Sequence, residues 1–146
     1  MTDKKNSNYT ISTNKKKLDV DLISRFLKNS YWSKGIPVEV VKKSIENSLC
    51  FGVYQCAKQV GFARVITDYS TFAYIADVFI VGEHRKRGLS KQMMTAILNH
   101  PDLQGLKRWL LSTKDAHGLY EKFGFKKPQH PDWNMEIANL NIYESK

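Results

Sequence analysis

Apolar residues along this chain follow the spacing of helices in four segments. Between Asp19 and Leu27 they recur at every third or fourth position, which predicts an amphipathic helix. Pro37 suits the first turn of a second helix, which we expect to end near Asn47. A third helical pattern covers residues 91–98, and a short fourth helix is expected over residues 116–122.

Shorter apolar runs between these segments predict strands. One strand should start at Tyr9 and end at Ser12, and another should cover residues 108–112. The strand at residues 108–112 follows a strand and a helix, so it should lie parallel to that earlier strand and be connected to it by a right-handed crossover. We expect two further strands near the C-terminus, at Phe125 and at Met135–Ile137. Three antiparallel strands joined by short polar connectors are expected at residues 49–54, 60–66 and 72–81. Together these elements predict a mixed sheet with helices on both faces.

A basic turn follows the apolar run that ends at Val81, and its sequence is His-Arg-Lys-Arg-Gly-Leu-Ser from residue 84. Gly88 lets the backbone approach a ligand closely, and the helix that follows offers unpaired N–H groups and a partial positive charge. The turn has neither the Walker nor the Rossmann glycine pattern. Strand, basic glycine turn and helix together predict a site for a phosphate-bearing ligand.

The turn has the pattern R-x-x-G-x-S at Arg85, Gly88 and Ser90, and residues 116–125 have the pattern A-x-x-x-Y-x-K-x-G-F. In this order, with a predicted strand between them, the two segments resemble signatures of the GNAT superfamily of acetyl-CoA-dependent N-acetyltransferases. The resemblance covers roughly residues 8–137. Ser90 stands where the family usually has Gly or Ala, and serine is small enough to keep the close approach.

The resemblance implies an α/β fold of the GNAT type, whose mostly antiparallel sheet is split into a V where two parallel strands part. One such domain would cover residues 8–146, after a polar tail over residues 1–7 that we expect to be disordered. The implied activity is direct transfer of an acetyl group from acetyl-CoA to a primary amine in a ternary complex. A non-catalytic module that senses acyl-CoA or binds a partner stays open as the alternative.

The same resemblance implies two groups of cofactor-binding residues. Main-chain N–H groups of the strand before the turn would face the acetyl carbonyl and pantetheine, as in an oxyanion hole. These positions are Val78, Phe79 and Ile80. Backbone groups of the turn would surround the pyrophosphate. These positions are Arg85, Lys86, Arg87, Gly88, Leu89 and Ser90.

Two residues are candidates for proton transfer. Tyr120 is the candidate general acid, because a phenol with a pKa of about 10 can give a proton to a departing thiolate; the alternative is a packed aromatic. Asp77 is the first candidate for the general base, since it lies on the strand beside the expected acetyl site. A purely structural aspartate is the competing interpretation, and a water chain, Asp115 or His117 could serve instead.

The segment between the first two helices lines the acceptor pocket in the family, and here it contains Tyr31 and Trp32. Two aromatic rings would suit an apolar or cationic acceptor, or they could cover the edge of the core. Arg64 lies in the middle of a predicted strand. It could hold an acceptor carboxylate, but we favour an ion pair with Asp77 or Asp68.

Composition narrows the classes of function. The 146 residues, 42% of them hydrophobic, suit one domain with a substantial core. We found neither an apolar run that could span a membrane nor a signal-peptide pattern, so we expect a cytoplasmic protein that does not bind membranes. The net charge of +9 suits an anionic cofactor and requires no specific nucleic acid.

The cysteines predict neither a disulfide nor a metal site. Cys50 and Cys56 would be too far apart on an extended segment to form a disulfide. They also lack companions at the spacing of zinc ligands, so no metal is expected. The acceptor, a small molecule or a protein amine, stays open, as does a homodimer.

Overall fold

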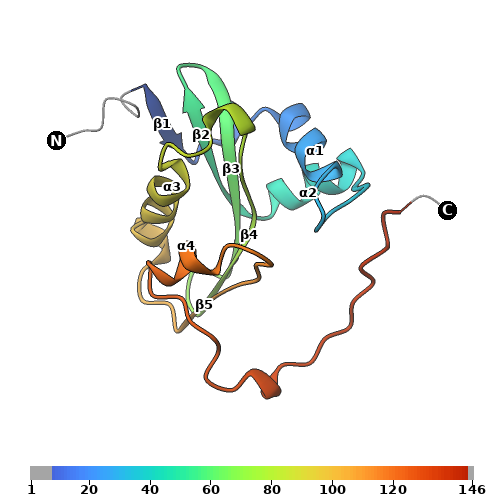
Figure 1. Cartoon of the computed structure of the whole chain (residues 1–146), viewed down its shortest axis with the longest axis vertical. Helices are drawn as coiled ribbons and strands as arrows, with labels where there is room; N and C mark the ends of the chain where they lie inside the picture. Colours follow the sequence, from blue (N-terminus) through green and yellow to red (C-terminus); the bar gives the residue numbers. More distant parts are fainter. Residues whose placement is uncertain (1–7, 145–146) are drawn as a thin grey trace.

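The computed structural model in Figure 1 describes residues 8–144, so the tail expected over residues 1–7 lies outside the described residues. The chain forms one five-stranded sheet whose strands are neighbours in chain order. The strands are β1 Tyr9–Ser12, β2 Leu49–Gln55, β3 Lys58–Thr67, β4 Phe72–Ile80 and β5 Arg108–Leu111.

The pairing of the strands confirms the predicted mixed sheet. The first four strands pair antiparallel, and β5 pairs parallel with β4. The parallel pairing begins at Phe72–Arg108 and ends at Ile75–Leu111. Because β4 continues to Ile80 without this neighbour, the sheet splits beyond Ile75.

Helices cover both faces of the sheet, as the sequence predicts (Figure 1). Side chains of successive strand residues point to opposite faces. Cys50 accordingly packs into an apolar cluster with α1 and α2, which we call the α1–α2 cluster, whereas Phe51 packs with α3. The helices are α1 Val20–Lys28, α2 Val38–Glu46, α3 Leu89–Leu98 and α4 His117–Glu121. Short 3-10 turns lie at Lys15–Lys17, Gly82–His84, Pro101–Leu103 and Pro131–Trp133.

Local signals explain where the helices begin and end. The Asp19 side chain accepts a hydrogen bond from the Leu22 amide and caps α1. Pro37 precedes α2, and Asn47 follows its last residue. Gly124, at a φ of +94°, lies beyond α4 in a conformation that favours glycine. None of the helices in the described part of the chain is both long and apolar enough to cross a membrane.

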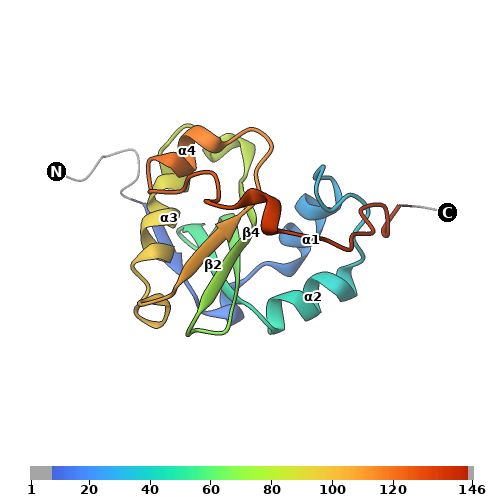
Figure 2. The ribbon, with the colours of Figure 1, turned by 90° about the horizontal axis from the view of Figure 1, so that it is seen from below.

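The prediction of two strands near the C-terminus is wrong. Phe125 lies in irregular structure, and Met135–Ile137 belongs to an extended segment outside the sheet. We call residues 129–144 the C-terminal arm. Figures 1 and 2 show the arm leaving the body beyond α4 and running to the side of α1 and α2. A strand needs a hydrogen-bonded neighbour, and the course of the arm takes it away from the sheet of its own chain.

Both cysteines are free thiols. Cys50 is buried in β2, and this burial raises the pKa of its thiol to about 11. Cys56 is exposed in the turn between β2 and β3, at a φ of +54°. Since a high pKa disfavours the reactive thiolate, Cys50 has the character of a core residue.

Candidate functional site

The backbone of β4 is open along one side where the sheet splits. A bulge places Asp77 and Val78 opposite Ala63 and shifts the register between β3 and β4. Asp77 has a φ of +56°, in the left-handed region that aspartate tolerates better than most residues. Bulges bend a strand and leave a residue unpaired. Beyond Ile75, the side of β4 that faces the split has no strand neighbour among residues 8–144.

The side chains at the open edge belong to the core, as expected. Phe79 and Ile80 are buried, and Phe79 stacks on Phe26 of α1 with ring centroids 3.9 Å apart. Val78 packs against the cluster on the α3 face. Only main-chain groups of Val78, Phe79 and Ile80 are therefore suited to contact a ligand in the split.

The open edge leads directly into the basic turn. Arg85, Lys86, Arg87 and Gly88 are all exposed, and Lys86 and Gly88 have φ angles of +64° and +76°. Gly88 is the N-cap of α3 and contributes no side chain there, so the N–H groups of the first turn stay accessible. The buried Leu89 side chain anchors this turn, and Ser90 is half-buried.

Two contacts fix the turn against the sheet. The Arg85 Nε donates to the carbonyl oxygen of Ile80 over 3.0 Å. The His84 Nδ1 and the Tyr9 hydroxyl lie 2.7 Å apart in a hydrogen bond that connects the turn to β1. The nine predicted cofactor-binding residues thus lie in two short segments, at the open edge of β4 and at the N-terminus of α3, and the hydrogen bond from Arg85 to Ile80 connects the two segments.

Asp77 lies at the centre of a polar network beside the split. Its Oδ2 accepts a hydrogen bond from Arg64 Nε at 2.8 Å, which confirms the predicted ion pair. Its Oδ1 accepts one from Trp32 Nε1 at 3.0 Å, and Arg64 Nη1 donates to the Ser48 hydroxyl. Since both carboxylate oxygens already accept hydrogen bonds, this geometry favours a positioning role for Asp77 over proton transfer.

Replacing Arg64 with methionine should lower the free energy of unfolding by about 3 kcal/mol. The change leaves the Asp77 carboxylate, 8% exposed, without its counter-charge, and breaking a buried pair on one side costs roughly 3–5 kcal/mol. Urea unfolding followed by tryptophan fluorescence measures the loss. The double variant Arg64→Met with Asp77→Asn removes both charges and should recover at least half of it. Equal losses in the single and double variants would contradict a buried-charge origin.

Tyr31 and Trp32 approach the split from the α1–α2 loop. Both rings are substantially exposed, and they contact each other edge to face at a centroid distance of 5.1 Å. The Lys114 ammonium lies 5.4 Å from the centre of the Tyr31 ring. The loop therefore presents two aromatic faces while Asp77 holds the Trp32 indole in place.

Tyr120 is buried on α4, with its ring edge to face against Phe125. Burial is the main cause that raises the pKa of Tyr120 above 10, and the nearby Tyr31 and Asp115 raise it further. Lys114, which contacts the Tyr31 ring, lies between β5 and α4, so the α1–α2 loop faces this part of the chain. A phenol with a raised pKa stays protonated through the neutral range, as a general acid must. The alternative bases Asp115 and His117 are both exposed.

A cavity of about 540 Å³ lies beside Tyr120. Its walls come from β5, from α4 and from the irregular segment 125–128, and they include Thr113 and His117. This cavity could not be predicted from the sequence pattern, which placed Phe125 in a strand. The sequence analysis also missed Lys114, since nothing in the sequence links this residue to Tyr31.

Within residues 8–144, no three His, Cys, Asp or Glu side chains gather where a metal ion could bind.

Comparison with known proteins gives concordant matches. Residues 46–127 match a family model described as an acetyltransferase (GNAT) domain. A candidate acetyltransferase of Gibberella zeae is 33% identical over 137 residues, which cover 78% of this chain and 76% of that protein. The crystal structure of a candidate GNAT acetyltransferase from Xanthomonas campestris pv. campestris is 48% identical, with a TM-score of 0.92 over 94% of this chain and 97% of that chain.

More distant structures share the fold. The crystal structure with acetyl-CoA of a candidate acetyltransferase from Clostridium acetobutylicum is 14% identical, with a TM-score of 0.64 over 90% of this chain and 95% of that chain. At this identity the likeness concerns the fold alone.

Proposed function

The chain belongs to the GNAT family of acetyltransferases, and on that premise we propose that it transfers the acetyl group of acetyl-CoA directly to a primary amine in a ternary complex. One observation carries the proposal. The open backbone edge of β4 from Ala76 to Ile80 is followed, after the 3-10 turn Gly82–His84, by an exposed basic turn at the N-terminus of α3. An extended chain that ends in phosphates fits such a surface along its whole length.

The residues of this surface suit acetyl-CoA. The open edge of β4 can bind an extended amide-containing chain in the way that a sheet edge binds a peptide strand. The N–H groups at the start of α3 suit the pyrophosphate, and the exposed Lys86 and Arg87 add positive charge there. Arg85 fixes the turn through Ile80, so its main contribution is to the shape of the site.

Acetyl-CoA supplies the activated thioester when it is bound. In our proposal main-chain N–H groups among Val78, Phe79 and Ile80 that face the split form the oxyanion hole for its carbonyl, and preorganised donors of this kind contribute roughly 10²–10³ in rate each. Ile80 is the best placed of the three, because neighbouring strand residues direct their N–H groups to opposite edges and that of Phe79 faces β3. The Tyr120 hydroxyl donates its proton to the departing sulfur. Tyr31 and Trp32 bind the acceptor, and the Asp77–Arg64 pair holds Trp32 in position. The amine gives its proton to water, because both oxygens of Asp77 are already engaged.

We also propose that the reaction takes place in the cytoplasm. Both cysteines are free thiols, and Cys56 is exposed to solvent. Exposed free thiols are usual where glutathione and thioredoxin keep cysteines reduced.

Calorimetric titration with acetyl-CoA tests the proposal first, with ATP and NAD as controls. We expect a micromolar dissociation constant for acetyl-CoA and much weaker binding of the controls. A panel of polyamines, amino acids and lysine peptides should then identify the acceptor by thiol release. A folded protein that binds acetyl-CoA no better than ATP would overturn the proposed cofactor site. Selective binding without thiol release for any amine would overturn the proposed transfer reaction.

A further inference from the structure

The α1–α2 loop presents aromatic rings that are exposed and yet held in place. Tyr31 and Trp32 are 59% and 41% exposed. Trp32 donates a hydrogen bond to the Asp77 carboxylate, and the Gly35 amide closes the loop by donating to the Lys28 carbonyl oxygen over 2.9 Å. Rings that are fixed before a ligand arrives provide contact area at little cost in conformational entropy. The loop is therefore suited to bind an aromatic or large apolar group.

Lys114 reaches these rings from the segment between β5 and α4. Its side chain is exposed, and its ammonium lies 5.4 Å from the centre of the Tyr31 ring. Among residues 8–144, no carboxylate forms an ion pair with this ammonium. A lysine ammonium offers three hydrogen-bond donors, so Lys114 can bind an anionic group of a ligand that lies against Tyr31.

The same contacts disfavour an acceptor with several positive charges. Arg64 already balances the charge of Asp77 over 2.8 Å, and both carboxylate oxygens accept hydrogen bonds. A cationic group could otherwise bind over the Tyr31 ring, but the Lys114 ammonium lies there and would repel it. Asp115, which is exposed next to Lys114, adds a single negative charge. One positive and one negative side chain next to each other suit a zwitterion better than a polyamine.

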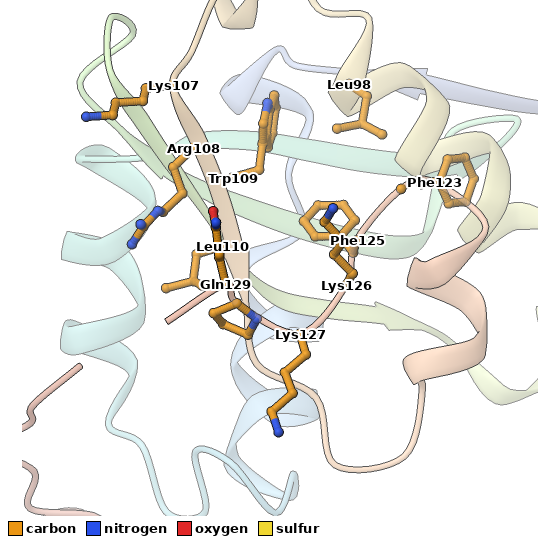
Figure 3. Close-up of a pocket in the computed structure, with 12 residues that line it drawn as sticks. Leu98, Lys107, Arg108, Trp109, Leu110, Phe123, Phe125, Lys126, Lys127 and Gln129 are labelled. Carbon is orange, nitrogen blue, oxygen red and sulfur yellow. The ribbon is translucent and has the colours of Figure 1, made fainter. Parts of the chain in front are cut away.

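The surface around the acceptor side carries more positive than negative charge. The cavity next to Tyr120 adjoins a second cavity of about 450 Å³ beside β5. Four basic residues line the two cavities: Lys107, Arg108, Lys126 and Lys127 (Figure 3). Glu121 is the one acidic residue in their walls. A surface with one predominant charge attracts ligands that carry the opposite charge, so this one favours an acceptor with a carboxylate.

The position of Lys114 restricts how far the carboxylate of the acceptor can lie from its amine. Thr113, the residue before Lys114, lines the same cavity as Tyr120. The site for the carboxylate is therefore close to the hydroxyl that gives its proton to the sulfur in the proposed reaction. Since the amine must attack beside that sulfur, amine and carboxylate of the acceptor lie close together, as they do in an α-amino acid.

We propose, on the basis of the proposed acetyl transfer, that the acceptor is a free amino acid with an aromatic or large apolar side chain. This side chain packs on Tyr31 and Trp32, and the carboxylate forms an ion pair with the Lys114 ammonium. The α-amine attacks the thioester carbonyl carbon, so an amide bond forms and the carbon–sulfur bond breaks. The amine loses one proton to water, and the sulfur takes a proton from Tyr120, which water then restores. The products are an N-acetyl amino acid and free coenzyme A.

Calorimetric titration with free coenzyme A present measures acceptor binding without turnover. It compares phenylalanine with phenylalaninamide, which lacks the carboxylate, and phenylalanine should bind at least about tenfold more tightly to the wild type. Lys114→Met should reduce this ratio to less than about twofold, whereas Lys114→Arg keeps the charge and should keep the ratio. The same two ligands are compared in each protein, so their different amine basicities cancel. Lys114 is exposed, so the variants should keep the circular dichroism of the wild type.

Lys42→Met is the matched control, because it removes an exposed lysine from α2 and should leave both affinities unchanged. Thiol release then compares phenylalanine with phenylethylamine and spermidine, and phenylalanine should give the highest kcat/KM. A binding ratio that Lys114→Met leaves unchanged, or a higher kcat/KM for either of the other amines, would overturn the amino-acid acceptor while acetyl transfer stands. Binding of phenylalanine that depends on Lys114 but gives no thiol release would support the ligand class and overturn the transfer reaction instead.

Discussion

Gly88→Glu should weaken acetyl-CoA binding by at least about 10³-fold. Gly88 has a φ of +76°, where a residue with a Cβ atom costs roughly 1–2 kcal/mol. The new carboxylate would also stand at the proposed pyrophosphate site, and two like charges about 4 Å apart repel by roughly 4 kcal/mol near a protein surface. Since about 1.4 kcal/mol is a factor of ten in affinity, the repulsion alone corresponds to about three decades, whereas the strain is present in the free and the bound protein alike and lowers stability. Calorimetric titration measures the change.

Gly105→Glu is the matched control for this variant. Gly105 has a nearly identical φ of +78°, has open space around it, and lies beyond the C-terminal end of α3. This variant carries the same strain and the same added charge, so it should bind acetyl-CoA as the wild type does. Gly88→Ala separates the two effects, because it adds strain without charge: it should lower the free energy of unfolding by roughly 1–2 kcal/mol and change the affinity for acetyl-CoA less than about tenfold. A folded Gly88→Glu protein with wild-type affinity would remove the turn from the proposed cofactor site.

Elements with strong local signals could be predicted from the sequence. The strand at Tyr9–Ser12, the helix that follows Asp19 and the parallel pairing of residues 108–111 all have the predicted place in the structure. Their periodicity, capping residues and crossover geometry act over short stretches of chain or follow a rule of handedness. The basic turn belongs to this class, because strand, glycine and helix are consecutive in the sequence.

The C-terminal strands illustrate what a sequence pattern leaves undetermined. Met135, Glu136 and Ile137 alternate as a strand should, yet they lie outside the sheet of their own chain. Alternation shows which side of an extended segment is apolar, but the choice of neighbouring strand depends on distant parts of the molecule. The alternation therefore identifies the apolar side of residues 135–137 and does not determine whether they join a sheet.

The acceptor side of the site depends on contacts between distant residues. Asp77 is 13 residues from Arg64 and 45 residues from Trp32, and both bind its carboxylate. The sequence therefore left open whether Asp77 acts as a base or as a structural aspartate. The three-dimensional contacts favour the structural role, since neither oxygen is left without a donor.

Tyr120→Phe should lower turnover by about 10²-fold while it changes the dissociation constant of acetyl-CoA less than about twofold. The variant keeps the buried ring and its contact with Phe125 but removes the hydroxyl that we propose as the general acid, a role that contributes roughly 10²–10⁴ in rate. Thiol release with the best acceptor of the amine panel measures turnover. Tyr54→Phe is the matched control, because it removes a buried hydroxyl without a hydrogen-bond partner from β2 and should leave turnover unchanged.

The pH dependence of turnover separates proton donation by Tyr120 from a packing role. A general acid acts only while it is protonated, so activity should fall as the pH rises through its pKa. Burial raises the pKa of Tyr120 above 10, which moves this decline to more alkaline pH than an ordinary phenol would give. The wild type should keep its activity to more alkaline pH than an ordinary phenol would allow, and Tyr120→Phe should lack the alkaline decline because no phenol remains to lose its proton. Wild-type turnover and an unchanged alkaline decline in the variant would leave Tyr120 as a packed aromatic and assign the proton to water.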